Sequence, residues 1–263
     1  MNERFLLAAR YLKYRLTAGT RHDVHSPFVF ALIEDVLRDH RSFYKFEEIE
    51  RLRQRLLKDD RSIRVTDLGA GSQLGPSRER KLSEIARHAA KPPKFGQLFF
   101  RLVNYLHPAY MLELGTSLGF SSAYLAAANS EAKLVTLEGC PQTAAVAQEN
   151  FSKLQLQNIE LVTGNFDETL APVLQALPRL DLAFLDGNHR KEPTLRYFHQ
   201  CLTKTHPGSL LIFDDIHWTT GMQEAWKEIK GHPSVACTID LFYIGLVFFR
   251  EEFREKQHFV LKY

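Results

Sequence analysis

The 263-residue sequence has few cysteines and no long apolar run. Its three cysteines, Cys140, Cys201 and Cys237, are scattered and odd in number, which excludes a disulfide framework and a zinc knuckle. No apolar run approaches the roughly 20 residues that a membrane-spanning helix needs. The first residues lack a small-residue cleavage site and predict an amphipathic helix, not a signal peptide. We therefore expect a reduced, cytoplasmic protein without a membrane partner.

The net charge of +3 conceals an uneven distribution. Residues 1–94 carry 20 Lys and Arg against 13 Asp and Glu, whereas the remaining residues carry 14 against 18. A basic segment can attract an anionic partner. Its charges are interspersed, however, as they are on solvated helix faces, so we expect no nucleic-acid partner.

Helical periodicity dominates the first third of the chain. Phe46–Asp60 predicts a helix with its leucines and isoleucine on one face, and Arg78–Ala89 predicts a shorter one. The pair Pro92-Pro93 marks a boundary. We therefore predict a helical N-terminal extension over residues 1–91 and a second domain over residues 92–263.

From residue 109 the pattern alternates between strands and helices. The predicted strands and helices cover residues 109–114, 119–129, 133–138, 141–155, 159–163, 167–176, 180–186, 192–204, 208–214 and 219–231. Such alternation predicts βαβ units and a parallel sheet in an α/β fold. Val235–Leu241 and Ile244–Arg250 follow as strands only two residues apart, and this short connection predicts an antiparallel pair.

Acidic and amide residues stand at the ends of the successive predicted strands. Because ligands bind beyond the carboxyl ends of the strands in an open parallel sheet, these side chains predict one active site. Gly115 and Gly119 give the first loop the backbone freedom that a nucleoside site needs. Their spacing is not G-x-G-x-x-G, which argues against a bound pyrophosphate. Glu138 is placed to accept hydrogen bonds from a ribose, and the turn at Asn165 and Asp167 is placed for an adenine edge.

The motifs ELGTSLG, LEGCP, GNFDE, LDGNH and IFDD, followed by the hairpin, together resemble the class I S-adenosylmethionine-dependent methyltransferases over about residues 92–250. The resemblance implies a seven-stranded Rossmann-like sheet with an antiparallel terminal strand. It implies that the helical N-terminal extension covers the substrate and takes part in a homodimer. It also implies an S-adenosylmethionine site made of Glu113, Gly115, Thr116, Ser117, Gly119, Glu138, Asn165, Asp167 and Asp186.

Within this fold the chain is similar to small-molecule O-methyltransferases of the catechol and macrocin types. The resemblance implies that Asp186, Asp214 and Asp215 hold Mg²⁺, and carboxylate oxygens are the ligands that this ion prefers. A bound dication lowers the pKa of an acceptor hydroxyl. His189 stands where the catechol enzymes carry a lysine, so we assign catalysis to His189 together with Asp186. The predicted partner is a small-molecule acceptor.

Three alternative functions stay open from the sequence. A metal-independent methyltransferase of the same fold would act on nitrogen or another atom. A nicotinamide-dependent oxidoreductase would also use Glu138 on a ribose. A non-catalytic nucleoside-binding protein would need only the cofactor residues. A second loop, Asp67–Gly71, looks like a first methyltransferase motif, but no strand ending in an acid follows it, so we interpret it as a loop without that role.

Overall fold

The computed structural model describes residues 3–66, 79–88 and 91–263. The chain forms two compact units, one made of Met1–Glu34 and Leu174–Tyr263 and the other of Asp35–Val173. The N-terminal segment predicted as one helical extension is thus shared between the two units. Asp67–Gly71 lies outside the described residues.

The unit over residues 35–173 contains the first half of the strand and helix alternation. Its elements are α3 (Tyr44–Leu56), β1 (Ser62–Arg64), β2 (Glu79–Lys81), α4 (Leu82–His88), α5 (Pro93–Leu106), β3 (Tyr110–Leu114), α6 (Phe120–Ala128), β4 (Lys133–Glu138), α7 (Pro141–Lys153), β5 (Ile159–Thr163) and most of α8 (Phe166–Ala176). The parallel strands β3, β4 and β5 are hydrogen-bonded in this order. The strands and helices predicted between residues 109 and 176 are confirmed to within two residues at each end.

The predicted helix over Phe46–Asp60 is present and buries the expected face. Ile49, Leu52 and Leu56 pack in one cluster with aromatic side chains of α5 and α6. The predicted helix over Arg78–Ala89 is wrong at its start, because Glu79–Lys81 forms the strand β2, antiparallel to β1. In this short strand Arg80 is buried between two exposed neighbours. That alternation has the period of two that a strand imposes.

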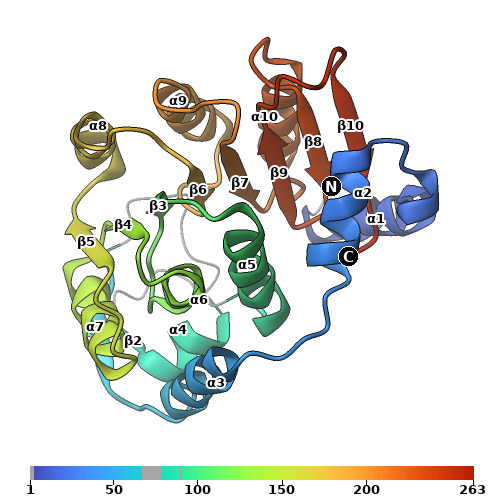
Figure 1. Ribbon diagram of the computed structural model, residues 1–263. Coiled ribbons are helices and arrows are strands. Elements are labelled where there is room, and N and C mark those ends of the chain that lie inside the picture. Colours follow the sequence, from blue (N-terminus) through green and yellow to red (C-terminus); the bar gives the residue numbers. More distant parts are fainter. Residues whose placement is uncertain (1–2, 67–78, 89–90) are drawn as a thin grey trace. The chain divides into compact units, whose positions relative to one another are not determined.

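The other unit contains the second half of the alternation and the start of the chain (Figure 1). Its elements are α1 (Glu3–Thr17), a 3₁₀ turn (Arg21–Asp23), α2 (Pro27–Leu32), β6 (Leu182–Leu185), α9 (Lys191–Leu202), β7 (Leu210–Asp214), α10 (Thr220–Gly231), β8 (Cys237–Asp240), β9 (Ile244–Phe248) and β10 (Gln257–Val260); a π-helical turn (Ile33–Leu37) lies at the boundary between the units. β6 and β7 are parallel, and the predicted antiparallel hairpin is confirmed as β8 and β9.

Strand β9 lies between β7 and β8 and is antiparallel to both. β10 adds a further strand beside β8, parallel to it, which was not predicted. The mostly parallel strands flanked by helices confirm the predicted Rossmann-like α/β fold. None of the helices in the described part of the chain is long and apolar enough to span a membrane.

The first helix is fastened to the last residues of the chain. The hydroxyl group of Tyr14 donates a hydrogen bond of 2.5 Å to the carbonyl oxygen of Leu261. The backbone N–H of Gly19 donates to the carbonyl oxygen of Val260, and the N–H of Lys262 donates back to Gly19. These bonds place α1 in the same unit as β6 to β10, although more than 150 residues separate them in sequence.

Candidate functional site

The loop after β3 is built around a buried carboxylate. Glu113 is fully buried, and its Oε2 atom accepts hydrogen bonds from the hydroxyl groups of Thr136 in β4, at 2.6 Å, and Ser122 in α6. The Oγ1 atom of Thr116, in the loop, lies 2.6 Å from the Oγ1 atom of Thr136. The carboxylate of Glu113 therefore ties together β3, β4 and the start of α6, which holds the loop in one conformation.

Two glycines give this loop its tight turn. Gly115 and Gly119 have φ angles of 98° and 82°, a region that residues with a side chain rarely adopt. A Cβ atom at Gly119 would lie 2.4 Å from Cε1 of Phe151 in α7. Gly119 stands directly before α6, so the loop leads into a helix N-terminus. Both the φ value and the close ring explain why a glycine is needed there.

Glu138 joins the end of β4 to the same loop. One carboxylate oxygen accepts the backbone N–H of Ser117 at 2.8 Å, and the other accepts the N–H of Cys140 at 2.9 Å. The side chain is half-buried. A carboxylate has about four lone-pair positions, so these two bonds leave it able to accept further hydrogen bonds from a ligand hydroxyl.

The turn after β5 begins the helix α8. Asn165 accepts the backbone N–H of Asp167 through Oδ1 at 3.1 Å, and its carbonyl oxygen accepts the N–H of Thr169 at 2.9 Å. Asp167 itself is exposed in the first turn of the helix. Asn165 thus caps the helix, a local role that accounts for an amide at this position.

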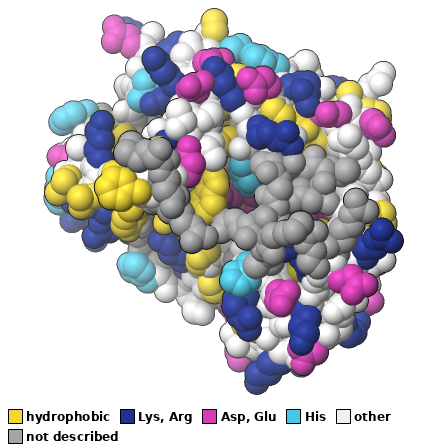
Figure 2. Space-filling view, turned by 180° about the vertical axis from the view of Figure 1, so that it is seen from behind, with side chains coloured by type: hydrophobic (Ala, Val, Ile, Leu, Met, Phe, Trp, Pro, Cys, Tyr) yellow, Lys and Arg dark blue, Asp and Glu magenta, His cyan; other side chains and the backbone are white. Residues whose placement is uncertain are grey.

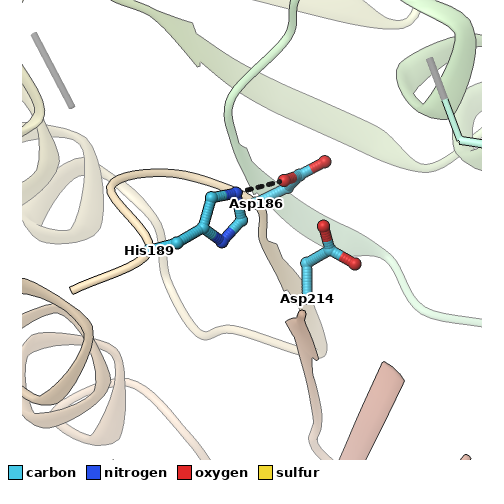
Figure 3. A group of neighbouring side chains, drawn as sticks. All are labelled: Asp186, His189 and Asp214. Atoms are coloured by element: carbon cyan, nitrogen blue, oxygen red, sulfur yellow. Dashed lines mark ion pairs between the residues drawn. The ribbon is translucent and has the colours of Figure 1, made fainter. Parts of the chain in front are cut away.

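The ends of β6 and β7 bring three of the predicted site residues together (Figure 3). Asp186, His189 and Asp214 each offer one ligand atom, and these atoms lie within 4.8 Å of one another. The Nε2 atom of His189 is 3.3 Å from Oδ1 of Asp186. Asn188, in the loop between them, has a left-handed φ of 52°. The ring of His189 lies beside the carboxylate of Asp186 at the strand end (Figure 3).

Asp214 is the buried member of this group, with 1% of its surface exposed. A buried carboxylate is stable mainly when it is paired or binds a metal. Two carboxylates and an imidazole suit a divalent cation. The neighbouring side chains of His189 and Asp186 are also chemically able to transfer a proton. Asp215 is not a member of the group; its φ is 51°, and its carbonyl oxygen accepts the backbone N–H of Trp218.

The loop after β7 contains a second histidine with defined partners. Nε2 of His217 is 2.7 Å from Oδ2 of Asp240, at the end of β8, and Nδ1 is 3.2 Å from Nε2 of Gln223. Its ring stacks on Phe242, with the centroids 5.1 Å apart. Sequence reasoning missed Asp240, although Asp240 is also an acid at a strand end.

Arg10 in α1 is a further residue that sequence reasoning missed. Its guanidinium donates to the carbonyl oxygens of His217 and Trp218 and to the hydroxyl group of Thr220. No local sequence signal marks Arg10, because its partners are more than 200 residues away. The contact nevertheless fixes the loop that follows Asp214.

Comparisons with known proteins agree with this description. Residues 112–216 match a family model described as a methyltransferase domain. A catechol O-methyltransferase from Niastella koreensis is 31% identical over 127 residues, which are 47% of this chain and 57% of that protein. The chain thus spans about half the length of the curated relatives it matches.

Solved structures show the same fold. An O-methyltransferase from Bacillus cereus in complex with S-adenosylhomocysteine has a TM-score of 0.56 at 20% identity, covering 84% of this chain and 97% of that one. TomG of Streptomyces achromogenes, in complex with S-adenosylmethionine, has a TM-score of 0.58 at 18% identity, covering 84% and 95%. Residues 112–216 are thus similar to a methyltransferase domain, and fold and sequence together show the likeness of the chain to class I S-adenosylmethionine-dependent O-methyltransferases.

Proposed function

We propose that this protein transfers the methyl group of S-adenosylmethionine to a hydroxyl oxygen of a small molecule, with a divalent cation, Mg²⁺, assisting. The observation that carries the proposal is the group of Asp186, His189 and Asp214 at the ends of two neighbouring parallel strands. The matched methyltransferase domain extends over both of these strand ends. The acceptor is a small molecule of unspecified class.

The loops after β3, β4 and β5 support the cofactor part of the proposal. In this assignment the loop Glu113–Gly119, with Thr116 and Ser117, holds the amino-acid part, and Glu138 accepts hydrogen bonds from the ribose. The turn at Asn165 and Asp167 contacts the adenine, and Asp186 borders the cofactor. The support is the rigid glycine turn and the remaining acceptor positions of Glu138. When bound, the cofactor supplies an electrophilic sulfonium methyl group.

Asp186 and Asp214 are the proposed ligands of the cation, and the donor set fits a divalent ion. Bound there, Mg²⁺ would lower the pKa of the acceptor hydroxyl and orient it. Asp215 is the third ligand that the sequence resemblance implies. Its absence from the group of Asp186, His189 and Asp214 leads us to assign the metal to the other two aspartates.

His189 is the proposed general base. Its Nε2 atom is beside Asp186 Oδ1, which favours a proton on Nε2 and leaves Nδ1 to take the proton of the acceptor hydroxyl. Asp186 then stabilises the imidazolium that forms. The new bond joins the acceptor oxygen to the methyl carbon while the bond from sulfur to that carbon breaks. Alignment of these atoms supplies most of the rate enhancement in such transfers.

Calorimetric titration with S-adenosylhomocysteine tests both parts. Chelator-treated protein is titrated with and without Mg²⁺, and the variant Asp214→Asn is titrated in parallel. We expect the nucleoside to bind both proteins, and Mg²⁺ to bind the unchanged protein only. Binding of S-adenosylhomocysteine without any response to Mg²⁺ would contradict the proposed metal site but would still support the methyltransferase function. If S-adenosylhomocysteine does not bind at all, the proposed function is wrong.

The three cysteines support a proposal about the compartment. Cys140, Cys201 and Cys237 are free and buried, and burial raises the pKa of the Cys201 and Cys237 thiols to about 12. We therefore propose a reducing compartment, the cytoplasm. We propose no nucleic-acid partner at this site, because carboxylates at the strand ends would repel phosphates.

A further inference from the structure

The helix α1 carries apolar side chains on two opposite faces. One face is buried: Tyr14 and Ala18 form a cluster with Phe242, and Leu7 packs against it. The hydroxyl group of Tyr14 is hydrogen-bonded to Leu261 as well. This face accounts for the attachment of α1 to its own unit and needs no further partner.

The opposite face of α1 exposes large apolar side chains. Phe5, Leu12 and Leu16 have 67%, 61% and 77% of their surface exposed. At about 100° per residue these three positions lie within about 40° of one another around the helix. Ala8 and Ala9 are exposed near them. We call Phe5, Ala8, Ala9, Leu12 and Leu16 the apolar stripe.

The stripe stands out from the rest of the protein surface. Among the described residues only seven large hydrophobic side chains are exposed, and four of them, Phe5, Tyr11, Leu12 and Leu16, belong to α1. In Figure 2, which is turned by 180° from Figure 1, hydrophobic side chains gather at the left of the view, on the side to which the turn brings α1. Exposed hydrophobic side chains are normally scattered singly over a protein surface. A contiguous apolar surface of this kind therefore marks an interaction site.

Cationic side chains border the apolar stripe on both sides. Lys13 and Arg15 lie about 80° to either side of Phe5 around the helix, and both are exposed. Neither forms an ion pair with a residue in the described part of the chain. The one acid of α1, Glu3, is already paired with Arg10 at 3.5 Å. The exposed side of α1 is therefore apolar in the middle and positive at its edges.

We propose that α1 docks on an anionic lipid surface, with the apolar stripe in the headgroup and acyl boundary and with Lys13 and Arg15 among the headgroups. Interfacial helices combine these two features, and their binding depends on apolar area together with attraction to anionic lipids. The expectation of no membrane partner rested on the lack of a spanning segment. A helix that lies along the surface needs no such segment.

A second copy of the chain is the competing occupant of the apolar stripe. Two copies packed through it would bring their positive borders together, and the single acid of α1 is already paired with Arg10. A two-fold interface repeats the same contacts on both sides, so this repulsion would occur twice. An anionic lipid surface instead complements the positive borders, and the charges favour it as the occupant.

Vesicle co-sedimentation of the full chain tests this docking. Vesicles of phosphatidylcholine with phosphatidylglycerol are compared with vesicles of phosphatidylcholine alone. We expect binding to the anionic vesicles, and we expect Leu12→Ser with Leu16→Ser to weaken it by about tenfold or more, since each leucine loses its buried apolar area. Lys13→Gln with Arg15→Gln should weaken binding to the anionic vesicles selectively.

The matched control is Tyr44→Ser, which removes an equally exposed apolar side chain from α3. It should leave vesicle binding unchanged, and thermal melting checks that every variant is folded. Docking on lipid is overturned if the unchanged protein ignores anionic vesicles, or if the two leucine substitutions do not alter its binding. Analytical ultracentrifugation that shows a dimer, dissociated by the leucine substitutions, would assign the stripe to a second copy instead.

Discussion

The guanidinium of Arg10 donates a hydrogen bond of 3.1 Å to the carbonyl oxygen of His217, a residue 207 positions further along the chain. The same side chain also reaches Trp218 and Thr220. One residue of the first helix therefore holds the loop that follows the buried Asp214. The conformation of this loop thus depends on a contact with the start of the chain.

Arg10→Ala should change turnover more than cofactor binding. Hydrogen bonds from a charged donor contribute about 1.5–3 kcal/mol each, so their loss should free the loop. We expect a kcat about tenfold lower and a higher KM for the acceptor, with an unchanged affinity for S-adenosylhomocysteine. Arg10→Lys keeps the positive charge but has fewer hydrogen-bond donors, so it should recover part of the kcat. Unaltered steady-state kinetics in Arg10→Ala would show that the loop does not need this contact.

His189→Gln should abolish proton transfer while it preserves binding. Glutamine has a similar reach and can still donate to Asp186, but it cannot accept a proton. We expect kcat to fall by about 10²- to 10⁴-fold, with the dissociation constant of S-adenosylhomocysteine unchanged. The control is His206→Gln, since His206 is also bonded to an aspartate, Asp181, at 2.8 Å, but stands before β7. Equal kinetics for the two variants would remove His189 from the mechanism.

Gly119→Ala should destabilise the protein and weaken cofactor binding. An alanine there would need a φ of 82° and a Cβ atom 2.4 Å from the ring of Phe151. We expect the free energy of unfolding to fall by about 1–3 kcal/mol, measured by denaturant unfolding. Gly231→Ala is the matched control, because no atom lies within 4 Å of its Cβ position. In the helix α10 it should leave stability unchanged or raise it by up to about 1 kcal/mol.

Asp39 should make the stability of the protein sensitive to acid. Hydrogen bonds from the Arg41 side chain hold the pKa of Asp39 below its usual 3.8, despite partial burial, and Arg101 adds a favourable charge. The unfolded chain therefore binds a proton at higher pH than the folded chain does. The stabilisation is fully present above about pH 4 and is lost as the pH falls through the lowered pKa.

Asp39→Asn should remove this part of the pH dependence. Unfolding by denaturant is measured between pH 3 and pH 6 in both proteins, and the two curves of stability against pH should converge at the acid end. Parallel curves would mean that Asp39 has the same pKa in the folded and unfolded chains.

Much of the fold could be predicted because its signals are local. The strand and helix periods between residues 109 and 231 come from neighbouring residues, and so does the turn of two or three residues that makes β8 and β9 antiparallel. The glycine loop at Gly115 and Gly119 is similarly local, since a positive φ is a property of one residue. β10 was missed because its four residues give too short a pattern, and the segment that precedes it forms no helix or strand that would mark a further unit of the alternation.

The sequence by itself determined the alternation of strands and helices, the glycine turn and the set of acids at the strand ends. Only the tertiary structure decided which acids lie together. Asp214 and Asp215 are equivalent in a list of strand-end acids, but β7 ends at Asp214 and the chain turns at Asp215, whose φ is 51°, so Asp214 alone joins Asp186 and His189. The contact of Arg10 with His217 and the exposure of Leu12 and Leu16 likewise depend on packing between distant segments, which no local pattern records.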